Sequence, residues 1–357
     1  NLTDSGIAVV AGTGTFETAA NNTDITLNQI NVVGAIALTT SGAGGDATLV
    51  NAVATVLEAS TIDGGLDVTA TAGSITDNGA PTITVGGVAS FTAIGTGGAV
   101  TIDGTLAAVT DLTVNTVGSF RVDGDNATNL TNVTITVNPA TAGDSTYVLT
   151  VGTFSNISAF ALTDSTADIN IGTTTFGTAV NFSVTATSGA LLDNGVLTTG
   201  GTGTFETIAN NADITLNQLA VTGDIALTTS GAGGNATVVN AVAIDLATST
   251  VDGNALVTAT AGNLTDAGVA TVGGTGTFET VANNADITLN QLSVTGAIGL
   301  TTSGASGNAT VVNAIATNLG ASLVDGNALV TATTGNLTDS GIAVVAGTGT
   351  FETVANN

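Results

Sequence analysis

The stretch GTGTFETVANNADITLNQL at Gly274–Leu292 recurs along the chain and decides its fold. Its phenylalanine marks each copy, at Phe16, Phe205, Phe278 and Phe351, and the last three of these are equally spaced along the sequence. Self-similarity at a fixed period is typical of solenoids, in which each unit packs only on its neighbours. The sequence therefore predicts an array of one repeated unit rather than a set of independent globular domains.

A shorter period inside this repeat follows the asparagines. Two equal steps, such as Asn217 to Asn240 and Asn240 to Asn263, are followed by a longer one to Asn290, so we expect three coils per repeat. The longer step falls near Asn283 and Asn284, which predicts one widened loop. Amides that stack at equivalent turns can satisfy one another, so we expect asparagine ladders between coils. The predicted ladder residues are Asn28, Asn51, Asn217, Asn240, Asn263, Asn290, Asn313 and Asn336.

Short alternating runs such as ADITLNQL, GAIGLTTSG and ALVTATTGN, separated by Gly, Asn or Asp, are typical of β-strands. A coil of about 23 residues built from such runs is what a parallel β-helix requires, with Val, Ile, Leu and Ala facing a thin core. We therefore predict an all-β parallel β-helix (β-solenoid) of 73-residue, three-coil repeats. A string of small β-sandwiches is the alternative, but it leaves the shorter asparagine period unexplained and lacks a large aromatic core.

The chain divides by regularity into three segments of what we expect to be one continuous rod. Residues 1–90 and 205–357 keep the period, whereas residues 91–204 depart from it and hold most of the phenylalanines. Aromatic residues and Arg are favoured at interfaces, so the middle segment offers a candidate contact patch. The alternative that we favour is that diverged coils fill their core with Phe. The patch would consist of Phe120, Arg121 and Tyr147.

Charge and composition exclude several classes of function. The net charge is −26, with 27 acidic residues against Arg121, so phosphate backbones and anionic membranes are repelled and no nucleic-acid binding is expected. No apolar run approaches the ~20 residues that span a bilayer. A polysaccharide-acting β-helix enzyme with paired carboxylates is a remote alternative. The chain has no His or Lys to tune such a pair, so we expect no catalytic residues and no enzyme.

Acidic residues recur at fixed places in the repeat. Asp24, Asp213 and Asp286 precede the ITL run in three copies. Calcium can bridge carboxylates and turn carbonyls, which makes these three the candidate metal ligands. The nonapeptide calcium repeat GGxGxDxUx is absent from the sequence. We therefore favour a solvated surface charge that limits aggregation, and we expect no cofactor.

The phrases TVGGTGTFET, ADITLNQL, GAIGLTTSGASGNATVVNA and GNALVTATTGNLTDSG resemble the repeats of very long bacterial surface and secreted proteins related to filamentous haemagglutinin-type adhesins. The resemblance is clear over residues 1–90 and 201–357. It implies a right-handed parallel β-helix, an extracellular or cell-surface location on a bacterium, and no catalytic motif. Two functions follow from it as expectations: a structural fibre or sheath protein that associates with itself, or the stalk of an adhesin that displays a binding region elsewhere. Cell-surface or matrix glycans are candidate partners.

The two ends of the sequence share one phrase. Residues 336–357 repeat residues 1–22 with a single change, Ala19 against Val354. We therefore expect the chain to be a window of a longer polypeptide. Because the ends of a β-helix carry unpaired strand edges, we also expect continuation or self-association along the axis.

Overall fold

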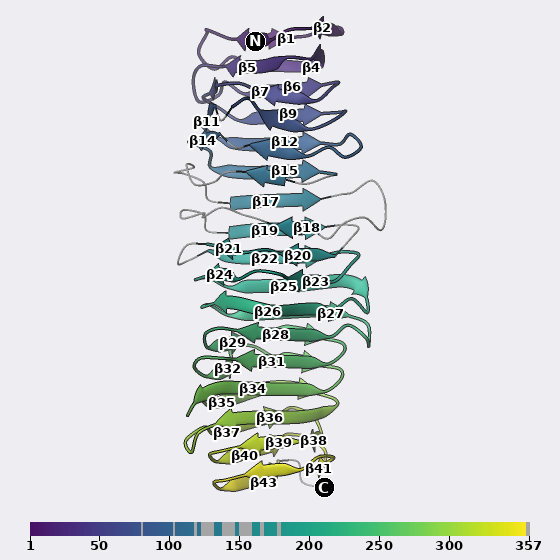
Figure 1. The fold of residues 1–357 in the computed structure, drawn as a ribbon, viewed down its shortest axis with the longest axis vertical. Helices are drawn as coiled ribbons and strands as arrows, with labels where there is room; N and C mark the ends of the chain where they lie inside the picture. The colour runs from purple at the N-terminus through teal and green to yellow at the C-terminus, as the bar shows by residue number, and fades with distance from the viewer. Residues whose placement is uncertain are drawn as a thin grey trace. The chain divides into compact units, whose positions relative to one another are not determined.

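The computed structural model describes residues 1–79, 81–102, 104–117, 120–122, 132–137, 147–149, 159–164, 168–176 and 180–354. Every regular secondary-structure element in this part is a β-strand, which confirms the predicted all-β class. The chain forms two compact units, each a stack of coils whose strands pair in parallel with those of the next coil (Figure 1). Unit 1 comprises Asn1–Thr166 and Thr174–Val180, and unit 2 comprises Ala167–Thr173 and Asn181–Asn357.

As far as β16, the coils of unit 1 pass in turn through two parallel sheets, which we call the β4 sheet and the β5 sheet. The strands of the β4 sheet are β1 (Leu2–Thr3), β2 (Ala8–Val10), β4 (Ile25–Val32), β6 (Ala47–Asn51), β9 (Leu66–Ala70), β12 (Val88–Ala93), β15 (Asp111–Thr116), β17 (Asn132–Val137) and β19 (Ala159–Asp164). Those of the β5 sheet are β3 (Gly14–Glu17), β5 (Ala35–Thr39), β7 (Thr55–Leu57), β8 (Ser60–Ile62), β10 (Ile75–Asp77), β11 (Thr82–Val85), β13 (Val100–Ile102), β14 (Thr105–Ala107) and β16 (Phe120–Val122). Unit 1 also contains β18 (Tyr147–Leu149) and β21 (Thr174–Thr175).

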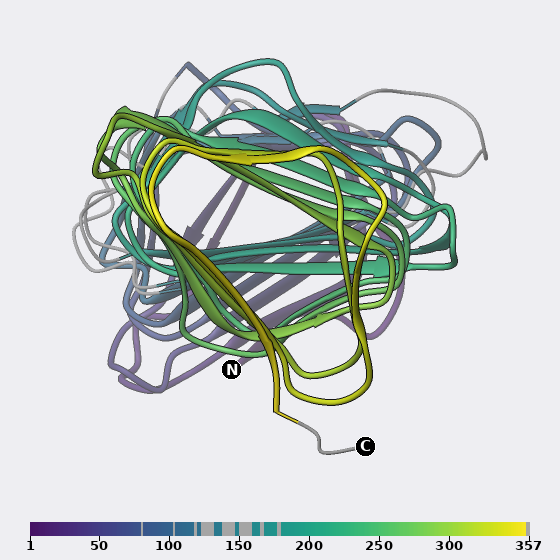
Figure 2. The same cartoon turned by 90° about the horizontal axis from the view of Figure 1, so that it is seen from below.

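Unit 2 has the same arrangement, with a β25 sheet and a β26 sheet. The strands of the β25 sheet are β22 (Asn181–Ala186), β25 (Gly203–Asn210), β27 (Ile225–Ser230), β29 (Ile244–Leu246), β30 (Ser249–Val251), β32 (Leu264–Asp266), β33 (Ala270–Val272), β35 (Ile287–Val294), β37 (Ala309–Asn313), β40 (Ala328–Ala332) and β43 (Gly349–Thr353). Those of the β26 sheet are β20 (Ile169–Ile171), β23 (Leu191–Asp193), β24 (Leu197–Thr199), β26 (Ile214–Val221), β28 (Ala236–Asn240), β31 (Ala255–Ala259), β34 (Gly276–Asn283), β36 (Ala297–Ser303), β38 (Thr317–Leu319), β39 (Ser322–Val324), β41 (Leu337–Asp339) and β42 (Ala343–Val345). Seen along the stack in Figure 2, the last coils follow one another around a common closed outline.

Strand pairing gives the length of each coil. In the β26 sheet Ile214 pairs with Ala236, Ala236 with Ala255, and Ala255 with Gly276. The residue number therefore advances by 22, then 19, then 21 from one coil to the next. The predicted parallel β-solenoid is thus confirmed, with coils slightly shorter than expected. Its predicted right-handed sense stays a prediction.

One repeat of unit 2 makes three and a half coils rather than three. Three coils lead from Ile214 to Gly276, and a further half coil leads to Ile287, which is the counterpart of Ile214 and lies in the β25 sheet. Strands with corresponding sequences therefore alternate between the sheets. Strand β25 lies in the β25 sheet and its counterpart β34 in the β26 sheet, whereas β26 lies in the β26 sheet and its counterpart β35 in the β25 sheet. The repeat therefore contains the three expected coils and a further half coil, which the asparagine spacing does not show because it compares positions that differ in the coil.

Period-two burial explains why the repeat sequence forms strands. In β26, Ile214, Leu216, Leu219 and Val221 face the core, while Asn217 and its neighbour Gln218 are both exposed. These two residues form a bulge, since the pairing with β28 shifts register between Leu216 and Leu219. The bulge keeps both halves of the run ITLNQLAV in phase with the core.

Two repeats of unit 2 each begin with a phenylalanine that fills the core. Phe205 and Phe278 are fully buried, and each lies opposite a leucine of the next coil, Leu227 or Leu300. Glycine two residues earlier makes room for the ring, because a Cβ on Gly276 would lie 2.9 Å from the ring of Phe278. The short side chains of this sequence thus accommodate one large ring per repeat.

The described part of the middle segment uses its phenylalanines in the same way. Phe91, Phe176 and Phe182 are buried, as expected for diverged coils with aromatic cores. The Phe182 and Phe205 rings contact each other with centroids 6.1 Å apart. Of the candidate contact patch, Phe120 and Arg121 lie in β16 and Tyr147 lies in β18, but their side chains fall outside the described part of the chain, and the patch stays a prediction.

Candidate functional site

The most regular polar feature of unit 2 is a staircase of Asn and Asp side chains at the start of successive strands. The Oδ1 atom of each accepts a hydrogen bond from the backbone N–H at the corresponding place in the next coil. Along the β25 sheet, Asn263 accepts from Asp286 (2.9 Å), Asp286 from Asn308 (2.8 Å), Asn308 from Asn327 (2.9 Å) and Asn327 from Thr348 (2.8 Å). Along the β26 sheet, Asp213 accepts from Asn235 (2.8 Å), Asn235 from Asn254 (2.9 Å) and Asn254 from Thr275 (2.8 Å).

Unit 1 has the same staircase, and all three candidate calcium ligands belong to these staircases. Asn1 accepts from Asp24 (3.0 Å), Asp24 from Asp46 (3.3 Å) and Asp46 from Gly65 (2.7 Å). Asp24, Asp213 and Asp286 therefore use one carboxylate oxygen to bind backbone N–H groups. Within the described residues, no three His, Cys, Asp or Glu side chains lie together in a way that could hold a metal ion.

The predicted asparagine ladder was wrong, because its members occupy three different environments. Asn28, Asn217 and Asn290 are exposed at the bulges of the long strands, and Asn263 and Asn336 are exposed in turns. Asn51, Asn240 and Asn313 are fully buried at strand ends. In the strand pairing, Asn240 lies opposite Leu219 of the preceding coil and Ala259 of the next coil, and not opposite another asparagine. The staircases are ladders of this kind, but of the predicted residues only Asn263 belongs to one of them.

Each buried asparagine binds peptide groups of the preceding coil and of its own coil. The Asn240 Nδ2 donates to the carbonyl oxygens of Val221 and Ala243, both at 2.9 Å, and its Oδ1 accepts from Val221 N–H at 2.9 Å. Asn51 makes the same bonds to Val32 and Ala54, and Asn313 to Val294 and Ala316. A buried amide with all its partners stabilises the corner that it occupies.

Aspartates at the ends of short strands bind the bulges. The carboxylates of Asp4, Asp193 and Asp266 accept from the backbone N–H of Gln29 (2.6 Å), Gln218 (2.7 Å) and Gln291 (2.7 Å), one coil later. Burial raises the pKa of Asp193 above its ordinary value, although the N–H groups of Asn217 and Gln218 act in the opposite direction. The repeated acids therefore bind backbone N–H groups that the bulge leaves without a strand partner.

A third set of aspartates binds the glycine-rich turns. Asp63, Asp252 and Asp325 accept at Oδ2 from the backbone N–H of Gly42 (2.7 Å), Gly231 (2.8 Å) and Gly304 (2.9 Å). Asn283 and Asn284, where a widened loop is expected, lie beside one of these turns, with Asn284 in the left-handed region at φ 62° and its N–H bonded to Ser303. The extra residues fall instead within β34, because its pairing with β36 shifts register between Glu279 and Asn283 and only residues 284–286 separate β34 from β35. The predicted widened loop was therefore wrong.

Two shallow surface grooves lie over the staircases of unit 2. The first, of about 670 Å³, crosses β26, β28, β31 and β34. The second, of about 620 Å³, crosses β35, β37, β40 and β43 in the other sheet. Every residue that lines the second groove has an identical counterpart in the first, at the equivalent place one repeat earlier. A smaller groove of about 300 Å³ in unit 1 is lined by Asp46, Gly65 and Asp67 among others.

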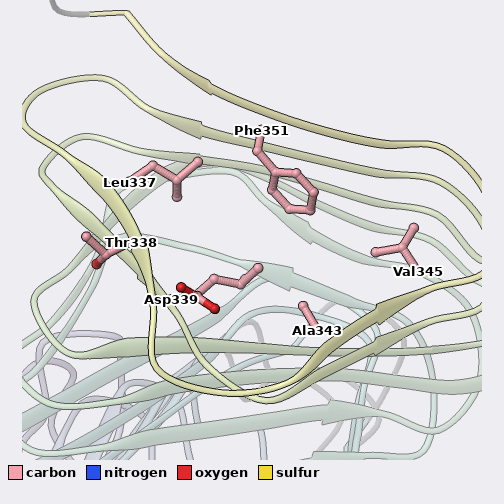
Figure 3. Close-up of a pocket in the computed structure, with 7 residues that line it drawn as sticks. Leu337, Thr338, Asp339, Ala343, Val345 and Phe351 are labelled. Carbon is pink, nitrogen blue, oxygen red and sulfur yellow. The ribbon is translucent and has the colours of Figure 1, made fainter.

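An apolar cavity of about 520 Å³ lies among the last described coils (Figure 3). Leu337, Val345 and Phe351 line it, and Phe351 is 47% exposed. These side chains belong to the solenoid core: the equivalent Phe278 is buried beneath Leu300 of the next coil. The cavity is therefore the uncovered interior of the described coils and not a built ligand site.

Comparison with known proteins gives one family. A family model described as repeats of unknown function (DUF5649) matches residues 44–115, 233–301 and 306–357, more than half of the chain. Each matched stretch begins in a glycine-containing turn just before Asp46, Asn235 or Asn308 of the staircases. No curated protein and no solved structure matches the chain.

Among the described residues, no helix has the length and apolarity needed to cross a bilayer.

Proposed function

We propose that this chain, which belongs to the family of repeats of unknown function (DUF5649), is a structural segment of an extracellular fibre or sheath on a bacterial surface, built as a self-associating β-solenoid. This proposal rests on one observation: the repeated polar side chains form hydrogen bonds between neighbouring coils. The staircase residues, the buried asparagines and the aspartates that bind the glycine-rich turns link coil to coil at the same positions in two successive repeats of unit 2. Such a network can be extended by any number of coils.

Charge favours association along the solenoid axis over side-by-side association. Copies that carry a net charge of −26 repel one another laterally. The exposed edge of a terminal coil instead offers unpaired backbone groups, which can pair with another strand without bringing the charged sides together. Axial contact, by continuation of the chain or by stacking of copies, is therefore the preferred mode in this proposal.

A stalk that carries an adhesive region elsewhere is the second candidate, and it requires the same solenoid. The two differ in what contacts the segment in its native setting. A fibre brings copies together end to end, whereas a stalk holds the segment apart from its copies. In neither case does the proposal assign the segment a catalytic role.

Electron microscopy and sedimentation of the purified chain of residues 1–357 test the proposal. We expect particles that lengthen end to end as salt rises from about 0.05 to 0.5 M, because screening lowers the remaining repulsion. A monodisperse monomer at every salt concentration would overturn the self-associating fibre. Tomography of producing cells then separates the two candidates, since a stalk shows isolated projections and a fibre shows a continuous filament.

A further inference from the structure

The twin grooves of unit 2 repeat one surface on two sheets. In each, rows of outward-facing threonines cross the coils beside the staircase: Thr215, Thr237 and Thr277 in the first groove, and Thr288, Thr310 and Thr350 in the second. A repeat of three and a half coils makes successive copies of the groove alternate between the sheets, since Asp213 lies before a strand of the β26 sheet and Asp286 before one of the β25 sheet. The groove thus belongs to the repeat itself.

The grooves offer hydrogen-bonding groups that the fold does not use. Within the described part of the chain, the hydroxyls of Thr215, Thr237 and Thr277 make no hydrogen bond, while the staircase amides and carboxylates bind through Oδ1. The Nδ2 of Asn254 and the Oδ2 of Asp213 likewise have no partner among the described residues. The groove therefore presents both donors and acceptors along its length.

Charge and size restrict the ligand. Among the residues that line the first groove, Asp213 and Glu279 are acidic and none is basic, so an anionic ligand is repelled. Both grooves are shallow and cross four coils, so they suit a ligand that lies along the sheet rather than a compact molecule. Coils repeat every ~4.8 Å along the groove, and an extended β-linked sugar chain advances by a similar distance per ring. Hydroxyl groups of such a chain can exchange hydrogen bonds with threonine, asparagine and aspartate in successive coils.

We propose that these two grooves bind a neutral, extended polysaccharide that runs along the coil stack, with Thr237 and Thr310 at the centres of the two sites. The binding surface does not depend on self-association, so this inference and the fibre proposal can fail separately. The unit 1 groove is smaller, and Asp67 stands there where the unit 2 grooves have Leu256 and Leu329. We therefore assign the neutral ligand to unit 2 alone.

Affinity electrophoresis of the chain of residues 1–357 tests this inference, with hydroxyethylcellulose as a neutral β-linked polymer and carboxymethylcellulose as its anionic counterpart. We expect retardation by the neutral polymer only. The double variant Thr237→Val, Thr310→Val removes one hydroxyl per groove and should weaken the apparent affinity at least about fivefold, given the usual contribution of a hydrogen bond. Valine suits an outward strand position, so the fold should be retained.

The matched control is Thr228→Val with Thr301→Val, which alters equivalent outward threonines that lie outside both grooves. It should bind within about twofold of the wild type, since no groove hydrogen bond is lost. Hydrogen exchange of the wild type with cellohexaose provides a second measurement that needs no variant, and we expect protection in residues 213–279 and 286–350. Absence of binding to the neutral polymer and of protection, equal loss in the control variant, or salt-sensitive binding of a lysine-rich peptide in its place would each overturn the inference.

Discussion

The carboxamide of Asn240 binds both polar groups of the Val221 residue in the preceding coil, with Oδ1 2.9 Å from its nitrogen and Nδ2 2.9 Å from its oxygen. Strand β28 ends at Asn240, which pairs with Leu219, so no backbone reaches the level of Val221 from this side. The side chain therefore continues the sheet where the strand stops. The same geometry joins Asn51 to Val32 and Asn313 to Val294.

Replacement of Asn240 by alanine should open this corner of unit 2. The change leaves the buried N–H and C=O of Val221 without partners, and each such group costs about 1–3 kcal/mol. We expect the local opening free energy, measured by hydrogen exchange at Val221 and its neighbours, to fall by about 3 kcal/mol. Asn217→Ala is the control, since Asn217 is exposed at the bulge, and an equal effect of the two changes would contradict the assigned role.

The sequence predicts the fold far better than the position of its polar contacts. Alternation of buried and outward residues in runs such as ITLNQL specifies parallel strands, and the regular recurrence of the whole phrase specifies the array. The asparagine spacing misleads because Asn217, Asn240 and Asn263 lie at a bulge, a strand end and a turn. Bulges and corners shorten or lengthen single coils, and they therefore determine which residues lie opposite one another in neighbouring coils.

The staircase could have been found from the sequence by one further signal. An Asn or Asp residue stands directly before the strand runs ITL, ATVV and ALV in two successive repeats of unit 2, at Asp213, Asn235 and Asn254 for example. Aligning strand starts rather than asparagines reproduces the observed pairing of Ile214 with Ala236 and of Ala236 with Ala255. The twin grooves could not have been predicted in this way, because each crosses four strands and depends on how the surfaces of successive coils combine.

Gly304→Ala should disturb the glycine-rich turn that contacts Asn283 and Asn284. Gly304 has φ +84°, and an added Cβ would clash with Oδ1 of Asn283 as well as lie 2.7 Å from Oδ1 of Asn284. The left-handed backbone alone costs a non-glycine residue about 1–2 kcal/mol. We expect faster amide exchange across residues 301–308. Gly6→Ala serves as control, since a Cβ there meets nothing within 4 Å, and equal effects would contradict the prediction.

Phe278→Ala should create a cavity in the core of unit 2. The Phe278 ring is 1% exposed and its loss should cost about 3–5 kcal/mol, as is usual for buried aromatic residues. Phe351→Ala removes the same side chain from a position that is 47% exposed, and it should cost much less. Urea unfolding followed by circular dichroism compares the two variants. Similar midpoints would contradict the view that burial under the next coil gives the ring its effect.

Asp193→Asn should change how stability depends on pH. Burial raises the pKa of Asp193 above its ordinary value of 3.8. For a raised pKa, the stabilising contribution is present at low pH and is lost as pH rises through the folded-state pKa, because ionisation of a half-buried carboxyl is unfavourable. Asparagine stays neutral and can still accept from Gln218 N–H through Oδ1. We therefore expect the variant to gain stability relative to the wild type between pH 4 and pH 7, measured by urea unfolding at low protein concentration. The control is Asp266→Asn, since Asp266 accepts the equivalent hydrogen bond from Gln291. The prediction would be contradicted if the stability difference between Asp193→Asn and the wild type stayed constant across this pH range, because ionisation of Asp193 would then have no effect.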